Sequence, residues 1–424
     1  MIANNLRKVY TNFDPLSPLT LDKSEFYVER KKGSFDRMKW ALTSDNQIPP
    51  KFLFSGHRGS GKSTELSKLM ADQEIRDKYF IVHYSVRDIL DIIGLDYTDL
   101  LVSIGAKILA EATVQKIKLK KGVLDELNNW GKPIEEQIIT DEGVEIGTEI
   151  GLNVFFAKTL SKLKSGKDTR TLIRKNIEPR LEELIEIINN LVITEVEKET
   201  GKKVLVAIDD LDKPDLSVAR QLFYERQSSL TLPRCTLIYT APIALLYSPD
   251  GNQVKQGFTD SFFLPNVTIT KHDDERSPDN EGRSVMKEFV LKRMSLNLID
   301  EDALEYSISV SGGVFREMAR IIGIAAANAF SRGEDKIQKQ DVEAAEAEIR
   351  NDFRRILEPE DYIALNKIYE TRDLKELEKR SNDPKDLEKP SKLLHNLSVL
   401  EYQNKENWCD VHPAVVPLIK EEKN

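Results

Sequence analysis

The first 270 residues alternate between short apolar runs and longer amphipathic segments. The apolar runs predict β-strands at residues 51–55, 79–85, 204–208 and 235–240, with a fifth strand within 262–269. Runs that are apolar at nearly every position are typical of parallel strands covered on both faces. Because helical segments separate these runs, the pattern predicts an α/β fold with a doubly wound parallel sheet.

The segment between the second and third predicted strands, about 120 residues long, exceeds what one crossover helix requires. We therefore predict an insertion over residues 113–200. Within it, residues 173–198 are rich in Ile, Leu and Glu and predict one long amphipathic helix. Residues 113–170 include the basic cluster KIKLKK, which indicates either a partner-binding excursion or a solvated basic helix followed by a short hairpin.

Helical periodicity dominates after a polar loop at residues 271–283. It predicts helices at 284–296, 302–310, 314–330 and 340–356, separated by glycines at 312, 313 and 333. Four such helices following an α/β core predict a helical lid.

The pattern changes again from residue 358. Two predicted helices, 362–369 and 392–397, precede two short predicted strands, 399–402 and 408–411, which is the order of a winged helix. The changes of pattern predict an α/β core over 1–270, a lid over 271–357 and a winged-helix-like domain over 358–424.

Composition and net charge exclude several classes of protein for this chain. Hydrophobic residues at 40% and charged residues at 31% are close to globular averages. A net charge of -9 argues against a polycation that coats nucleic acid or an anionic membrane. The two cysteines, Cys235 and Cys409, have no neighbouring Cys, which favours a reducing compartment. With neither a signal-peptide pattern nor an apolar run of about 18 residues, we expect a cytoplasmic protein without a membrane span.

One glycine-rich segment lies between the first predicted strand and a predicted helix. It fits the pattern GxxxxGK[ST] over Gly56, His57, Arg58, Gly59, Ser60, Gly61, Lys62 and Ser63, and Thr64 follows as a further binding residue. In this pattern backbone N–H groups wrap phosphates, and the glycines permit the backbone geometry. Lys62 is predicted to reach the β- and γ-phosphates of ATP, and the Ser63 hydroxyl to bind Mg²⁺. ATP and Mg²⁺ are therefore the predicted cofactors.

The third predicted strand ends in acidic residues, at the edge where open α/β sheets bind ligands. Asp209 is predicted to hold Mg²⁺ through water, and Asp210 to orient or deprotonate the attacking water. The alternative is an acidic turn in which Asp212 or Asp215 caps the next helix. The phosphate-loop pattern elsewhere in the chain favours the first interpretation.

Three segments, GHRGSGKST, VLVAIDDLD and SGGVFREMAR, together resemble AAA+ or closely related STAND-type ATPases. The resemblance covers about residues 25–350. It implies that Arg316, in a pattern similar to the sensor 2 segment of origin-recognition-like ATPases, touches the γ-phosphate from the lid. A solvent-facing helix arginine is the alternative interpretation.

Further roles follow from the same resemblance. Thr240 matches the position of a polar sensor 1 residue that positions the water or the γ-phosphate, although a strand-capping threonine explains it too. Tyr27 and Val28, in FYVER, fall where such ATPases wrap adenine, and a hydrophobic staple of an early helix explains them equally well. An arginine finger is not assigned, because Arg220, Arg226 and Arg234 lie in no diagnostic pattern.

The sequence departs from ordinary AAA+ enzymes, which carry Asp-Glu where this chain has Asp209 and Asp210. Asp-Asp-Leu-Asp looks more like STAND or KAP-type ATPases, which often act as switches. That resemblance implies slow turnover and control of a protein partner, in a homo-oligomer or through a separate effector, as in prokaryotic antiviral defence.

Two other functions stay open. One is an origin-recognition-like ATPase that acts on DNA through the winged helix, and the other is a nucleotide-binding module that barely turns over. DNA is the less favoured partner, because residues 353–424 carry 13 Lys/Arg against 15 Asp/Glu, whereas duplex binding requires neutralised phosphates.

Overall fold

The computed structural model describes residues 2–16, 19, 25–30, 34–120, 122, 129–132, 159, 163, 164, 167–273, 275–374, 384–404 and 406–422. Its centre is one parallel sheet with the strands β1 (Lys51–Gly56), β2 (Tyr79–Ser85), β3 (Lys203–Asp209), β4 (Thr236–Pro242) and β5 (Asp260–Leu264). The strand order is β2-β3-β4-β1-β5, and every neighbouring pair is parallel. All five predicted strands are found, although the fifth lies at 260–264 and only overlaps the predicted range 262–269. The predicted α/β fold is confirmed.

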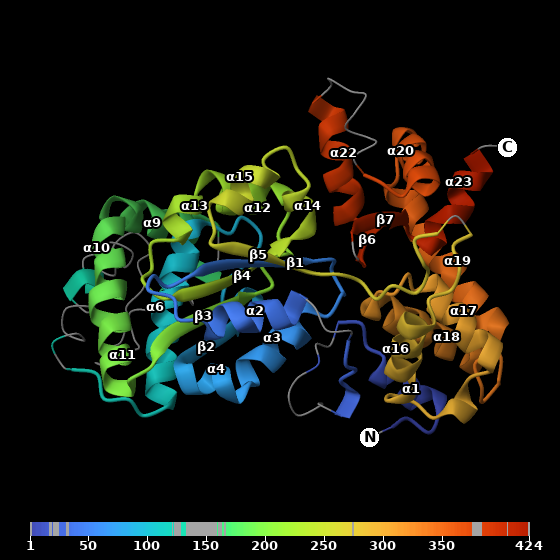
Figure 1. The fold of residues 1–424 in the computed structure, drawn as a ribbon, viewed down its shortest axis with the longest axis horizontal. Helices are drawn as coiled ribbons and strands as arrows, with labels where there is room; N and C mark the ends of the chain where they lie inside the picture. The colour runs from blue at the N-terminus through green and yellow to red at the C-terminus, as the bar shows by residue number, and fades with distance from the viewer. Residues whose placement is uncertain are drawn as a thin grey trace.

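Both faces of the sheet are covered, as the apolar runs predict (Figure 1). On β1, Phe52 and Phe54 join a hydrophobic cluster with α2 (Ser34–Thr43), α3 (Lys62–Ala71) and α4 (Gln73–Lys78). The residue between them, Leu53, belongs to the cluster on the other face. This alternation follows from the period of two along a strand, so neither side of the strand is available to solvent.

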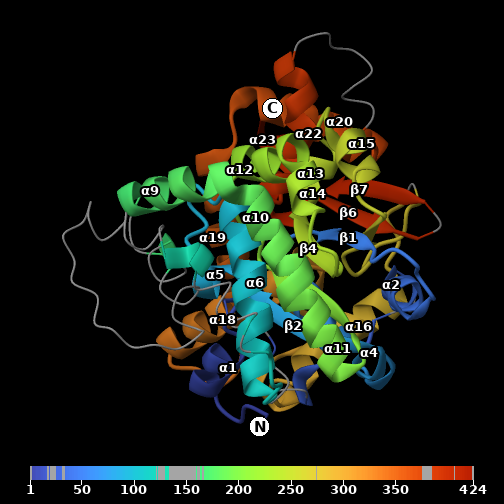
Figure 2. The ribbon, with the colours of Figure 1, turned by 90° about the vertical axis from the view of Figure 1, so that its left-hand side faces the viewer.

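The second face is covered by helices that follow β2, β3 and β4 in the chain. These are α5 (Val86–Ile89), α6 (Tyr97–Val114), α9 (Lys167–Ile177), α10 (Leu181–Glu186), α11 (Thr194–Thr200), α12 (Leu216–Arg220), α13 (Gln227–Leu230), α14 (Ile243–Leu246) and α15 (Gly251–Gln256). Figure 2 shows α10 and α11 following one another along one line, with α6 beside them.

The single long helix expected over 173–198 is wrong. The segment is divided into α9, a 3₁₀ turn at Glu178–Arg180, α10, a π-helical stretch at Ile187–Ile193 and α11. Pro179 lies in the 3₁₀ turn, and a proline inside a helix removes a backbone N–H and clashes with the preceding turn. Of the basic cluster at 116–121, residues 117–120 form no helix, and the predicted short hairpin lies outside the described residues.

The four helices predicted after the sheet are found as α16 (Asn280–Leu291), α17 (Glu301–Val310), α18 (Phe315–Ser331) and α19 (Lys339–Ile356). The N-terminal helix α1 (Leu6–Asn12) packs against α18 and shares its hydrophobic cluster. The break between α17 and α18 contains Gly312 and Gly313, whose φ angles of 59° and 73° suit glycine. The lid helices thus stand beside the sheet together with the start of the chain (Figure 1).

The C-terminal residues form α20 (Pro359–Thr371), α22 (Pro384–His395), an antiparallel hairpin of β6 (Val399–Gln403) and β7 (Asn407–Val411), and α23 (Val416–Glu422). We call this group the C-terminal module. It shares one hydrophobic cluster with the lid, and α22 packs against α14 of the core. Among the described residues, none of the helices combines the length and apolarity needed to cross a bilayer.

Candidate functional site

The glycine-rich segment forms a tight loop between β1 and α3. Gly56, Gly59 and Gly61 have φ angles of 154°, 85° and 99°, of which the last two lie well inside the region that favours glycine. Gly61 is the N-cap of α3, so the loop leads directly into the first turn of that helix. A Cβ on Gly59 would lie 2.4 Å from the Cβ of Arg316. The loop therefore needs glycine both for its own conformation and for the approach of α18.

Lys62 lies inside this loop. Its Nζ is 2.9 Å from the carbonyl oxygens of Gly56 and His57, and 2.7 Å from Oδ2 of Asp212. The side chains of Lys62 and Asp212 are only 4% and 5% exposed. The lysine is thus held at the bottom of the loop by three acceptors.

The acidic end of β3 meets the loop at Ser63. The Ser63 hydroxyl lies beside the Asp209 carboxylate, and Asp209, Asp210 and Asp212 offer oxygen atoms within 4.8 Å of one another. Burial, together with the neighbouring carboxylates, raises the pKa of Asp209 to about 6 although the Ser63 hydroxyl lowers it. A hydroxyl beside clustered carboxylates is a set of hard oxygen ligands, and these residues fit Mg²⁺.

Asp210 is held in an unusual backbone conformation, with a φ of 67°. Its carboxylate accepts a hydrogen bond from the Ser85 hydroxyl at 2.7 Å and pairs with Lys213 at 2.6 Å. A positive φ in a residue other than glycine persists where its surroundings fix it, and such residues cluster at functional sites. Here Ser85 and Lys213 fix the direction of the carboxylate.

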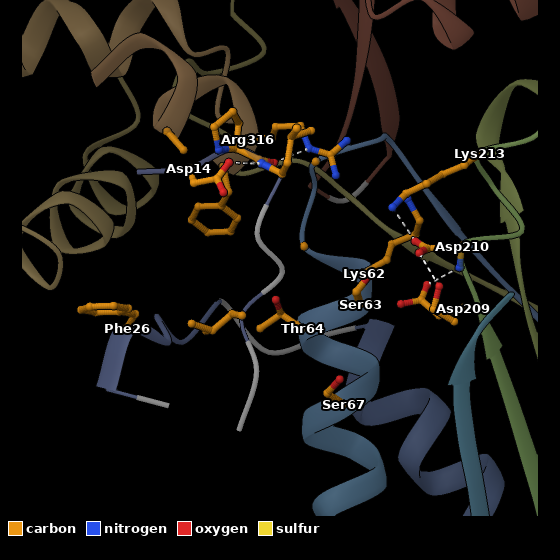
Figure 3. Close-up of a pocket in the computed structure, with 18 of the residues that line it drawn as sticks. Asp14, Phe26, Lys62, Ser63, Thr64, Ser67, Asp209, Asp210, Lys213 and Arg316 are labelled. Atoms are coloured by element: carbon orange, nitrogen blue, oxygen red, sulfur yellow. Dashed lines mark hydrogen bonds and ion pairs between the residues drawn. The ribbon is translucent and has the colours of Figure 1, made fainter. Parts of the chain in front are cut away.

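A cavity of about 760 Å³ extends over the loop from the acidic end of β3 to the lid. Eight of the sequence-predicted site residues line it: Gly59, Gly61, Lys62, Ser63, Thr64, Asp209, Asp210 and Arg316. Figure 3 shows Asp209 and Asp210 on one side of Lys62 and Ser63, with Arg316 and Phe26 on the other. The cavity is therefore bounded by the core, the lid and the N-terminal segment.

Arg316 lies in the first turn of α18, half-buried rather than facing solvent. Its backbone N–H donates to the carbonyl of Gly59 at 3.2 Å, and its Nε donates to the carbonyl of Pro15 at 3.2 Å. The guanidinium is thus directed along the cavity wall between the phosphate loop and the N-terminal segment.

The other predicted residues lie beside the cavity rather than on its wall. Gly56, His57, Arg58 and Ser60 form the back of the loop, and His57 and Ser60 are fully buried. Thr240 is also fully buried: its Oγ accepts from the N–H of Leu211 and donates to the carbonyl of Ile208. Thr240 therefore holds the backbone on both sides of the two aspartates.

Tyr27 and Val28 line a smaller, adjoining cavity of about 70 Å³, which Phe26 lines as well. The Tyr27 hydroxyl contacts Glu65 at 3.2 Å, and Val28 is packed in the lid cluster. The aromatic residue of FYVER that lines the larger cavity is Phe26.

Several lining residues were not predicted from the sequence. They come from the N-terminal segment, the edge of β2, the turn after β3 and the lid, and they include Asn12, Asp14, Pro15, Phe26, Ser85, Asp212, Lys213, Phe289, Arg293 and Phe315. Arg293 is buried over the ring of Phe289, at 3.8 Å from its centroid, and burial lowers its pKa to about 10. Three of them, Phe26, Asp212 and Phe315, lie in the motifs FYVER, VLVAIDDLD and SGGVFREMAR, but the sequence pattern assigned none of the three to the site.

The chain matches no protein-family model and no curated protein sequence. Among solved structures it is similar to Cdc6p from Pyrobaculum aerophilum, with a TM-score of 0.40 and 14% identity over 96% of this chain and 100% of that one. It is also similar to the ORC2 protein of Aeropyrum pernix, with a TM-score of 0.41 and 12% identity over 96% and 99%.

A third similar structure is RuvB from Thermotoga maritima, a Holliday junction branch migration motor, with a TM-score of 0.37 and 13% identity over 96% and 98%. Similarities at this level carry no inference about what this chain binds or does.

Proposed function

We propose that this chain binds Mg-ATP, hydrolyses it and acts as a nucleotide-driven switch of the AAA+ or STAND-like type that controls a protein partner. The observation that carries the proposal is the single cavity that Lys62, Ser63, Asp209 and Asp210 share with Arg316 of the lid. A phosphate chain over the loop would contact Lys62, and Ser63 and Asp209 would hold Mg²⁺. The metal would supply charge neutralisation at the phosphates.

The remaining residues take defined roles in this proposal. Asp210, fixed by Ser85 and Lys213, orients the attacking water. Arg316 contacts the terminal phosphate from the lid. Because the lid shares a hydrophobic cluster with the C-terminal module, a movement of α18 on hydrolysis would also move that module. A nucleotide switch is expected to couple hydrolysis at its site to such a movement of a neighbouring domain.

Two observations favour a protein partner over DNA. The C-terminal segment 353–424 has 13 Lys/Arg against 15 Asp/Glu, which gives no net attraction for phosphates. In addition, α22, the helix before the hairpin, packs against α14 of the core, so part of the surface that a recognition helix needs is covered. From the resemblance to STAND-type ATPases we infer a role in prokaryotic antiviral defence, through an oligomer or an effector.

The decisive experiment is the solution mass of the purified chain with ATP and Mg²⁺, with ADP, and without nucleotide. We expect an ATP-specific increase in mass that disappears in Lys62→Ala. A chain that stays monomeric, fails to hydrolyse ATP and binds duplex DNA with a steep salt dependence would overturn the protein switch in favour of the DNA function.

A further inference from the structure

Lys62 has no donor left for a ligand unless one of its protein contacts is given up. A lysine ammonium has three N–H donors, and three protein acceptors lie within 2.9 Å of this one: two backbone carbonyls and Asp212. A phosphate oxygen that binds Lys62 must therefore displace an acceptor. Asp212 is the acceptor that carries a charge, so it is also the one that a second anion repels.

The Asp212 carboxylate is buried, so it needs neighbouring cations to stay ionised. Burial alone would raise the pKa of this carboxyl, but the charge and hydrogen bond of Lys62, with Lys213 and Arg58 behind them, hold it below its usual value. Lys213 is already paired with Asp210. Arg58 is therefore the cation that can pair with the Asp212 carboxylate when Lys62 turns toward a phosphate.

Arg58 links this turn to the C-terminal module. Its guanidinium donates to the backbone carbonyls of Asp212 at 3.2 Å and Lys213 at 3.0 Å, and its Nη2 is 3.3 Å from Nε2 of His395 in α22. Burial and the charge of Arg58 lower the pKa of His395 to about 4, so this ring is neutral and can accept from the guanidinium.

From these contacts we propose that Asp212 sets the nucleotide affinity of the site by competing with phosphate for the Lys62 ammonium. When a phosphate displaces Asp212 from Lys62, Arg58 turns to the Asp212 carboxylate. The contact between Arg58 and His395 is then weakened. Asp212 is a positioning residue in this scheme, since it acts through Lys62. The inference rests on the proposed function and adds the route from the phosphates to the C-terminal module.

The affinity is tested with ADP, by calorimetry in EDTA and again in Mg²⁺. We expect Asp212→Asn to bind ADP about tenfold more tightly in EDTA, because an amide still accepts from Lys62 but adds no anion. The matched control is Asp215→Asn, an exposed aspartate of the same turn, which should change the affinity less than about twofold. On a Lys62→Ala background the gain from Asp212→Asn should vanish.

Two outcomes would overturn the competition. Equal or weaker binding by Asp212→Asn in EDTA, with its melting temperature retained, would show that Asp212 does not oppose phosphate. A loss confined to Mg²⁺ would make it a metal ligand instead. If Asp212→Asn does not fold, Arg58→Gln tests the scheme instead. Without Arg58 the Asp212 carboxylate should stay bound to Lys62, so ADP binding should weaken. An unchanged ADP affinity would refute the scheme.

Hydrogen exchange of α22 tests the route to the module. Exchange should accelerate when the wild-type chain binds ADP, and this acceleration should be absent in Asp212→Asn. Equal exchange in the wild-type chain with and without bound ADP would overturn the route. Failure of the wild-type chain to bind ATP or ADP at all would overturn the proposed function itself, a result distinct from either of these.

Discussion

Replacing Gly59 by alanine tests how closely α18 must approach the phosphate loop. The added Cβ would lie 2.4 Å from the Cβ of Arg316 and 3.3 Å from a methyl group of Val314. A Cβ cannot rotate away, so the helix or the loop must shift, which costs about 1–3 kcal/mol in a packed region. The φ of 85° at Gly59 adds about 1–2 kcal/mol for an L-residue. We expect a total loss of about 2–5 kcal/mol.

Gly333→Ala is the matched control for the cost of placing an L-residue at a positive φ. Gly333 has a φ of 79°, and a Cβ there would meet nothing within 4 Å, so we expect a loss of only about 1–2 kcal/mol. Urea denaturation of both variants measures the difference, and calorimetry with ADP measures the effect on the site. Equal losses of unfolding free energy in the two variants would refute the close approach of the lid to the loop.

Two further predictions concern hydrolysis and pH. Asp210→Asn should keep ADP affinity and lower phosphate release by about 100-fold or more; a parallel loss of affinity would contradict its assignment to the attacking water. Burial raises the pKa of Glu401 to about 7 despite hydrogen bonds from Tyr247 and Asn407. A raised folded pKa means that the folded chain binds the extra proton, so stability should fall as pH rises from about 4.5 through 7, by up to about 3 kcal/mol. Denaturation midpoints of Glu401→Gln should lack this slope between pH 5 and 8, and an unchanged slope would show that another group causes it.

The central strands β1, β3 and β4 could be predicted because they are buried on both faces, so their apolar runs are almost unbroken. The edge strands β2 and β5 carry half-buried or exposed positions, and their patterns are correspondingly less regular. The boundaries of α17, α18 and α19 could be predicted to within one residue, since breaks at glycines such as Gly312 and Gly333 separate these helices. The helix α16 begins and ends four to five residues earlier than predicted, because no glycine marks its ends.

The prediction of one long helix over 173–198 was wrong for a local reason. Its apolar periodicity continues through Pro179 and hides the break, whereas in the folded chain α9 ends at Ile177 and the proline lies in the 3₁₀ turn that follows.

The site was predictable only where its chemistry is local in the sequence. Lys62 and Ser63 follow from a pattern of eight residues, and Asp209 from the end of a strand. The walls contributed by Phe26, Phe289 and Arg293 come from segments far apart in the chain, and no local pattern indicates that they meet. The same is true of the pair between Lys62 and Asp212, in which the two residues are distant in sequence.

The variable positions of the phosphate loop carry information that the pattern GxxxxGK[ST] leaves out. In this chain Nε2 of His57 accepts from the backbone N–H of Glu401 in β6 at 2.8 Å. Arg58 contacts the turn after β3 and His395 of α22, and Gly59 admits α18. Three successive residues therefore join the loop to three neighbouring parts of the molecule. Under the proposed function a phosphate would bind the backbone of this loop, so a small shift there would reach the hairpin, the acidic turn and the lid together. If the proposed function is correct, His57, Arg58 and Gly59 are therefore the residues through which a bound phosphate would act on the rest of the molecule.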